Sequence, residues 1–283
     1  MNIVLYYMIN MKSRKFFKAL TYLIVGFIVA IYILFHLLGS NGVTPPYTDV
    51  IESFVYNNIV IPKYDGDVSE IVNDNVPLFT DKEIEDARKK TYEYYGPLDD
   101  LGRCSYAMAS LNKSLQPNYN RGSISDIYPT GWNQAYYDFL NDNGHLYERC
   151  HLIAYMLTGV DGENAKKQYA KRNLITGTEN MNSGPYDETG MVQYEYEVFD
   201  YINEHPNSNV LYRVTPIFEG NNLLASGVLM EAKSLDDDQI EFCVFCYNVE
   251  PNVQIDYRTG DSKTMLSDFQ ERIIGLLRQI VYN

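Results

Sequence analysis

The sequence predicts an α+β domain with a mixed, mainly antiparallel central sheet and flanking helices, behind one N-terminal transmembrane helix. Three successive segments alternate apolar and polar side chains, as half-buried strands do. These segments are residues 210–218, 223–233 and 240–249. Short polar stretches at 221–222 and 236–238 separate them, and such tight turns join neighbouring antiparallel strands.

Helices are predicted beside this sheet. Residues 189–204 place apolar side chains on one helix face. These are Met191, Val198 and Ile202. Glu195 falls on the same face, and a carboxylate on an apolar face needs a partner or a metal nearby. Residues 263–282 predict an amphipathic closing helix, and the charged residues 82–95 predict a surface helix.

The N-terminal region contains an uncharged run of twenty residues, 19–38, which is long enough to span a bilayer. Basic residues precede this run: Lys12, Arg14, Lys15 and Lys18. The positive-inside rule places the N-terminus in the cytoplasm and the rest outside. We therefore expect a cytoplasmic segment 1–18, a single-pass anchor in the cell membrane, a linker 39–60 and an extracellular domain 61–283. The alternative is a cleaved signal peptide and a secreted domain.

The chain is acidic, with 37 Asp and Glu against 23 Lys and Arg and a net charge of −14. Such a surface repels nucleic acid at long range, which counts against nucleic-acid binding. One basic cluster interrupts the acidic sequence: Lys166, Lys167, Lys171 and Arg172. The cluster is typical either of a loop that contacts an anionic substrate or of a solvated helix face, and the sequence favours neither.

Four cysteines follow the apolar run, and an extracellular domain permits disulfides. Cys104 and Cys150 are predicted on two central strands and form a candidate disulfide. Cys243 and Cys246 lie three residues apart in one strand, so their side chains leave opposite faces. This second pair is expected to be buried free thiols.

The segment 145–151, HLYERCH, has the pattern of a strand that carries chemistry on one face. Alternation places His145, Arg149 and His151 together, with Glu148 and Cys150 behind them. That face offers an imidazole base and a guanidinium fork that binds phosphate. Asn182 adds an oxygen ligand for a hard metal ion. A base, a phosphate ligand and a metal ligand are the groups that metal-assisted phosphodiester hydrolysis requires.

The segment Glu148-Arg149-Cys150-His151 resembles the Asp-Arg-Gly-His signature of the DNA/RNA non-specific endonuclease family, whose core is the ββα-metal, or His-Me, finger. Further segments resemble the bacterial secreted branch of that family, and the likeness extends over residues 61–262. They are LGRC (101–104), PTGW (129–132), RNLITGT (172–178), GM and YE (190–191 and 194–195), LYRVTP (211–216), SGVLMEAK (226–233) and IDYRTG (255–260).

The resemblance implies a role for each matching residue. His151 would be the general base, Asn182 the ligand of Mg²⁺ (with Mn²⁺ able to substitute), and Glu195 the holder of a metal-bound water. Arg149 would contact the phosphate. Arg121 and His145 are weaker candidates for substrate contact, as is the basic cluster.

Two residues depart from the family signature, because Glu148 replaces Asp and Cys150 replaces Gly. Both are predicted to face away from His151, so the departures should change packing more than chemistry. If the family's Asp supports the site through a hydrogen bond, however, the longer Glu148 side chain could loosen it.

The expected function is a membrane-anchored, extracellular, sequence-non-specific, Mg²⁺-dependent endonuclease. Its expected partners are DNA, RNA as a further substrate, the lipid bilayer through residues 19–38, and an unidentified inhibitor or uptake partner. One alternative is a degenerate surface protein of the same fold that binds nucleic acid or a partner. Another is a zinc hydrolase that uses His145, Cys150 and His151, which alternation disfavours because Cys150 faces away from both histidines.

Overall fold

The computed structural model describes residues 51–267 apart from 119, 141–143, 161–166 and 185–188, together with residues 270, 271 and 274. The predicted segments 1–18 and 19–38, and the linker up to residue 50, lie outside the described residues. Within the described part of the chain, no helix has the length and apolar character needed to cross a bilayer.

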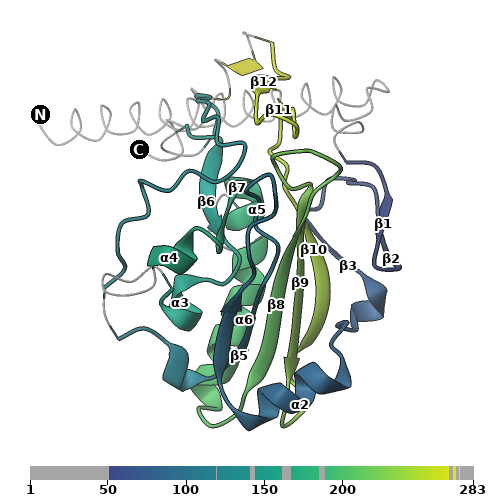
Figure 1. The fold of residues 1–283 in the computed structure, drawn as a ribbon. Helices are drawn as coiled ribbons and strands as arrows, with labels where there is room; N and C mark the ends of the chain where they lie inside the picture. Colours follow the sequence, from purple (N-terminus) through teal and green to yellow (C-terminus); the bar gives the residue numbers. More distant parts are fainter. Residues whose placement is uncertain are drawn as a thin grey trace, which may run out of the picture. The chain divides into compact units, whose positions relative to one another are not determined.

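An antiparallel sheet of six strands is at the centre of the described domain (Figure 1). Its order is β3-β10-β9-β8-β5-β4, and every pairing is antiparallel. The strands are β3 (Ser69–Ile71), β4 (Tyr92–Tyr95), β5 (Ala107–Leu111), β8 (Val210–Ile217), β9 (Gly227–Ser234) and β10 (Glu241–Tyr247). The α+β class and the predicted run of three consecutive antiparallel strands, β8 to β10, are confirmed.

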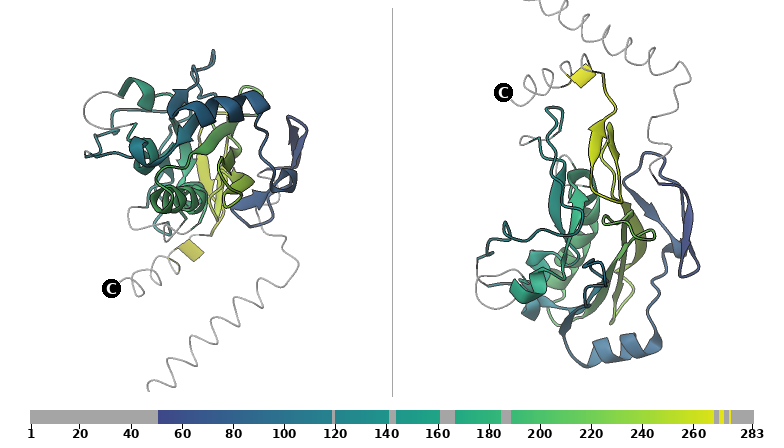
Figure 2. Two further views of the ribbon diagram at one scale, coloured as in Figure 1. Left: turned by 90° about the horizontal axis from the view of Figure 1, so that it is seen from below. Right: turned by 45° about the horizontal axis from the view of Figure 1, so that its top comes forward.

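The sheet separates two layers. Helix α6 (Met191–Glu204) packs on one face, where Val210, Tyr212 and Val214 of β8 join its apolar side chains in one buried cluster. On the other face, helix α2 (Asp81–Lys89) packs against Leu211 through Ala87. Figure 2 shows the sheet between α2 and α6. Because alternate residues of β8 enter different layers, the strand has no polar face turned wholly to solvent.

Residues that the sequence assigned to a linker are part of this domain. β1 (Phe54–Tyr56) and β2 (Ile59–Ile61) form an antiparallel hairpin. Ile51, Ile59 and Ile61 are each at most 2% exposed and join Phe245 of β10 in a second buried cluster. The folded domain therefore begins no later than Ile51, before the predicted boundary at residue 61, since these isoleucines need burial.

Two predicted helices differ from the structure. The predicted helix 82–95 ends at Lys89, and the aromatic residues that follow form β4, because aromatic side chains fit a half-buried strand. The predicted closing helix does not begin at Lys263, since β12 (Ser262–Thr264) pairs with β11 (Val253–Ile255). Most later residues lie outside the described part of the chain.

A separate two-stranded ribbon packs on the α6 layer. β6 (Tyr147–His151) pairs with β7 (Leu174–Thr178), and helix α5 (Glu179–Asn182) follows β7 directly. The short helices α3 (Tyr155–Thr158) and α4 (Lys167–Ala170) belong to the connection between the two strands. The order strand, strand, helix is the expected ββα finger.

Two buried asparagine side chains hold this finger in place through hydrogen bonds. The side chain of Asn173 exchanges two hydrogen bonds with the backbone of Ile153, at 2.8 and 2.9 Å, and so closes the connection between β6 and β7. Asn248 follows β10 and is fully buried. It accepts from the Thr178 amide at 2.9 Å and donates to the carbonyls of Thr176 at 3.1 Å and Ala225 at 3.0 Å. Asn248 thereby links β7 to the segment just before β9.

Asn248→Ala is expected to lower the free energy of unfolding by about 3 kcal/mol or more, because it leaves three buried backbone groups without partners. Urea unfolding followed by circular dichroism measures the change. Asn221→Ala, at an exposed position of the turn before β9, is the matched control and should change stability by about 0.5 kcal/mol or less. An Asn248→Ala variant as stable as this control would show that the buried amide does not hold the finger.

Candidate active site

His151 ends strand β6 and is half-buried. The Nη2 atom of Arg121 lies 3.1 Å from its Nε2 and 3.4 Å from its Nδ1. A single Nη2 atom this close to both ring nitrogens lies against the ring rather than along one lone pair, and its positive charge disfavours the charged imidazolium. This contact therefore favours the neutral imidazole, which is the form that can accept a proton from water.

Arg149 binds the segment 125–132, which precedes the finger in the sequence. Its Nε donates to the Ile127 carbonyl at 2.6 Å, and its Nη2 donates to the Ser125 carbonyl at 2.9 Å. The guanidinium also stacks over Trp132 at 4.2 Å and lies 5.3 Å from the Tyr128 ring centre. These contacts give Arg149 a structural task, and its expected contact with the phosphate stays a prediction.

Asn182 is held by the residue that departs from the family signature. Its Nδ2 donates to Glu148 Oε2 at 2.7 Å. Because the amide nitrogen faces Glu148, the amide oxygen is oriented for another partner, such as a cation. Glu148 thus contacts the predicted metal ligand through a hydrogen bond, so its replacement of Asp bears on the site as well as on packing.

The second departure from the family signature, Cys150 in place of Gly, affects packing. It is fully buried, and a side chain on Gly177 of β7 would lie 2.5 Å from its sulfur. Glycine at position 177 therefore leaves the space that the Cys150 side chain fills. Burial raises the pKa of the Cys150 thiol well above its ordinary value.

The predicted Cys104–Cys150 disulfide is wrong, because all four cysteines are buried free thiols. Cys104 lies 3.2 Å from the Leu174 carbonyl and Cys150 lies 3.9 Å from the Thr178 carbonyl. Those carbonyls are four residues apart on an extended strand, about 13 Å. The two sulfurs are therefore several ångströms too far apart to bond. Cys243 and Cys246 belong to different buried clusters, so the predicted pair of free thiols on opposite faces is confirmed.

Glu195 lies on the buried face of α6, as predicted, and is 8% exposed. Burial raises the pKa of its carboxyl to about 8. The charge of Glu195 in turn acts on the thiols of Cys150 and Cys246 and on the hydroxyl of Tyr212. The Tyr212 hydroxyl is a buried oxygen with no hydrogen-bond partner among the described residues. The carboxyl therefore lies near buried thiols and a buried hydroxyl, and a cation beside it would lower its pKa.

The remaining residues that were predicted to contact substrate lie in different parts of the domain. Lys171 and Arg172 are exposed at the turn before β7. Lys167 is the first residue of α4, and Lys166 lies outside the described residues. His145 precedes β6, is half-buried and meets the Tyr136 ring edge to face at 4.7 Å.

The donor set suits a hard divalent ion. Asn182 offers an amide oxygen and Glu195 a carboxylate, and Mg²⁺ prefers such oxygen ligands. Among the described residues, only Asp65, Asp67 and Glu70 bring three His, Cys, Asp or Glu ligand atoms together. The zinc site of His145, Cys150 and His151 is therefore not formed.

Arg121 contacts the predicted general base, which the sequence did not indicate. It lies in a segment without helix or strand, 30 positions before His151, so neither periodicity nor spacing could bring the two together. The structure forms two pairs, Arg121 with His151 and Glu148 with Asn182. Their β6 members are three residues apart, about 10 Å along a strand. Convergence of the two pairs on one phosphate stays a prediction.

Comparison with known proteins agrees with this arrangement. A deoxyribonuclease of Streptococcus dysgalactiae subsp. equisimilis is 33% identical over 118 residues, which is 42% of this chain and 33% of that protein. The match therefore spans about a third of the length of that relative.

Two solved structures have similar folds. NucA from Streptococcus agalactiae, with a magnesium ion bound, has a TM-score of 0.58 and 27% identity, covering 75% of this chain and 89% of that one. The Sda1 nuclease with a bound zinc ion has a TM-score of 0.51 and 26% identity, covering 62% and 81%.

A model of one protein family matches residues 83–236, more than half of the chain. This range contains the finger β6–β7–α5, both pairs of site residues and Glu195. The chain belongs to the DNA/RNA non-specific endonuclease family, a family of nuclease enzymes.

Proposed function

We propose that this protein is a Mg²⁺-dependent endonuclease that hydrolyses DNA phosphodiester bonds without sequence specificity. The observation that carries the proposal is a pair of side-chain contacts made by residues of β6: Arg121 lies against His151, and Glu148 holds Asn182. The magnesium bound to the similar NucA and the description of the deoxyribonuclease relative support the choice of metal and substrate.

In the proposed reaction, His151 accepts a proton from the water that attacks phosphorus. Arg121 keeps the imidazole in its base form, and its guanidinium lies where it can also contact a phosphate oxygen. Asn182 would hold Mg²⁺ through its oxygen, and Glu195 would hold a water of the metal. A bound Mg²⁺ would supply positive charge for the negative charge that develops at the phosphate oxygens.

The setting of the enzyme is also part of the proposal. The uncharged run 19–38 and the basic residues before it support a cell-membrane anchor with the domain outside, and a cleaved signal would give the same domain in secreted form. RNA as a further substrate, Mn²⁺ as a substitute and an inhibitor or uptake partner are proposed with it. The acidic composition supports salt-dependent cleavage or a partner that supplies positive charge, and a salt titration without any effect on cleavage would contradict the salt dependence.

Plasmid cleavage by the full chain tests the role of His151. Wild type should nick DNA with Mg²⁺ and stop with EDTA, and His151→Ala should reduce the rate by at least about a hundredfold, since a general base contributes that much. His205→Ala, at the far end of α6, is the matched control and should cleave as wild type does. A folded wild type that binds DNA but never cleaves it would instead support the degenerate binding protein.

Removal of the Glu148 carboxylate should weaken metal binding. For Glu148→Ala, the Mg²⁺ concentration that gives half-maximal cleavage is expected to rise about tenfold to a hundredfold, because Asn182 loses the partner that orients it. Glu148→Asp keeps the carboxylate and should have a smaller effect. Identical Mg²⁺ dependence of wild type and Glu148→Ala would contradict the assigned role.

Glu195 should make metal-free stability depend on pH. The unfolded carboxyl loses its proton near pH 4.5 and the folded one near pH 8. Between these values the wild type therefore loses stability as pH rises, by at most roughly 1.4 kcal/mol per pH unit. Glu195→Gln lacks this loss, so its free energy of unfolding, relative to that of wild type, should increase from pH 5 to 8 and then level off. Urea unfolding in EDTA measures this difference, with Glu204→Gln at the exposed end of α6 as control. A constant difference between wild type and Glu195→Gln would contradict the burial argument.

A further inference from the structure

Tyr128 presents an exposed aromatic ring beside strand β6. It is 69% exposed, whereas Ile127 before it is buried in a cluster with Ala170 and Leu174. Pro129 follows and restricts the Tyr128 backbone to extended conformations, in which neighbouring side chains point to opposite sides. The burial of Ile127 therefore turns the Tyr128 ring outward. One exposed ring is ordinary in a folded domain, so its surroundings decide whether it can bind anything.

Two side chains hold this ring in one orientation. The guanidinium of Arg149 lies over the Tyr128 ring, with its central carbon 5.3 Å from the ring centre. Trp132 meets the ring at a steep angle, with the ring centres 6.4 Å apart. One face of the ring is turned to Arg149, and the high exposure of Tyr128 leaves the opposite face open. Because its neighbours already order the side chain, a ligand that stacks on it requires little further loss of conformational entropy.

The ring lies close to the residues proposed for the reaction. The segment that carries Tyr128 contacts β6 at two points, where Arg121 Nη2 lies 3.1 Å from His151 Nε2 and where Arg149 Nε donates to the Ile127 carbonyl at 2.6 Å. Arg149 and His151 are two residues apart on one face of β6, about 7 Å. A nucleic-acid strand with a phosphate at His151 would therefore bring a neighbouring base within reach of Tyr128.

Stacking on a base is the interaction that this ring offers. Every nucleobase has a flat face, so stacking on an aromatic side chain adds affinity whatever the sequence. In a duplex the neighbouring base pairs cover these faces, so the ring can stack only on an unpaired base. The chain carries a net charge of −14, which weakens its long-range attraction for phosphates. An uncharged contact with a base is not subject to this repulsion.

We propose that Tyr128 stacks on an unpaired base of the substrate strand and so gives the enzyme a preference for single-stranded over duplex DNA. This inference rests on the proposed nuclease function. It adds a residue that binds a base to the residues that act at the phosphate.

Fluorescence anisotropy of the full chain in EDTA tests the preference without cleavage of the probe. One probe is a labelled oligothymidylate, and the second is an abasic strand with the same number of phosphates but no bases. Relaxed closed-circular plasmid, which has no ends at which a base face is open, competes as the duplex. Wild type should bind the oligothymidylate at least about fivefold more tightly than the abasic strand, the least that one stacked base contributes.

Tyr128→Ala should lower the affinity for the oligothymidylate by about fivefold or more, and should leave the affinities for the abasic strand and the plasmid as they are. Tyr128→Phe keeps the ring and should bind all three as wild type does.

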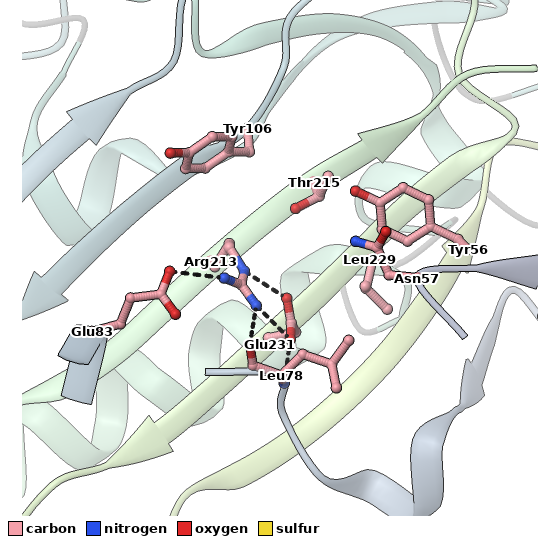
Figure 3. A pocket seen from close by; sticks show the side chains of 9 residues that line it. All are labelled: Tyr56, Asn57, Leu78, Glu83, Tyr106, Arg213, Thr215, Leu229 and Glu231. Carbon is pink, nitrogen blue, oxygen red and sulfur yellow. Dashed lines mark hydrogen bonds and ion pairs between the residues drawn. The ribbon is translucent and has the colours of Figure 1, made fainter. Parts of the chain in front are cut away.

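Tyr94→Ala is the matched control, because it also removes an exposed tyrosine ring. Tyr94 is 44% exposed and packs on Tyr106 with ring centres 5.4 Å apart. Tyr106 lines a pocket on the face of the sheet opposite α6 and the finger, as Figure 3 shows. Removal of the Tyr94 ring should therefore change none of the three affinities.

Equal affinity of wild type and Tyr128→Ala for the oligothymidylate would overturn the proposal. An equal loss of affinity for the oligothymidylate and the plasmid would also overturn it, since the ring would then act through Arg149 and not on a base. The nuclease function is decided separately by plasmid cleavage. A chain that binds single strands through Tyr128 but cleaves no DNA would overturn that function and leave the stacking contact standing.

Discussion

The candidate site depends on a buried amide that is far from it in the sequence. Asn248 follows β10 and bonds both to β7 of the finger and to the segment just before β9. A two-stranded ribbon is marginally stable alone in water. The finger therefore keeps its geometry because this amide attaches it to a sheet that is stable by itself. The backbone bonds of Asn173 have the same effect inside the finger.

The charged side chains of the domain differ in the partners that surround them. Arg149 and Arg213 each stack on an aromatic ring and bond to backbone carbonyls, so both serve the architecture. Arg121 instead meets a half-buried imidazole. No charged group among the described residues contributes to the pKa shift of Glu195, so burial alone raises it.

Much of this was predictable from the sequence. Strands β8 to β10 alternate over seven or eight residues, and α6 places its apolar residues on one face, so periodicity identified both. The ββα finger was predicted from the Glu148-Arg149-Cys150-His151 motif and from the order of the segments that follow it. The contact of Arg121 with His151 was not predictable, because it depends on how irregular chain folds back in space. That of Glu148 with Asn182 depends on how α5 packs against β6, which periodicity does not show. The hairpin of β1 and β2 was missed, since three-residue strands are too short to show a period.

The four free thiols mean that covalent cross-links contribute nothing to this fold. The domain can therefore reach its folded state without an oxidising catalyst, and a reducing medium should leave it intact. Burial raises the pKa of Cys104 and of Cys243 to about 12, so the reactive thiolate is scarce at neutral pH. An enzyme built in this way can work where redox conditions fluctuate, since it has no disulfide for a reductant to break and burial shields its thiols from mild oxidants.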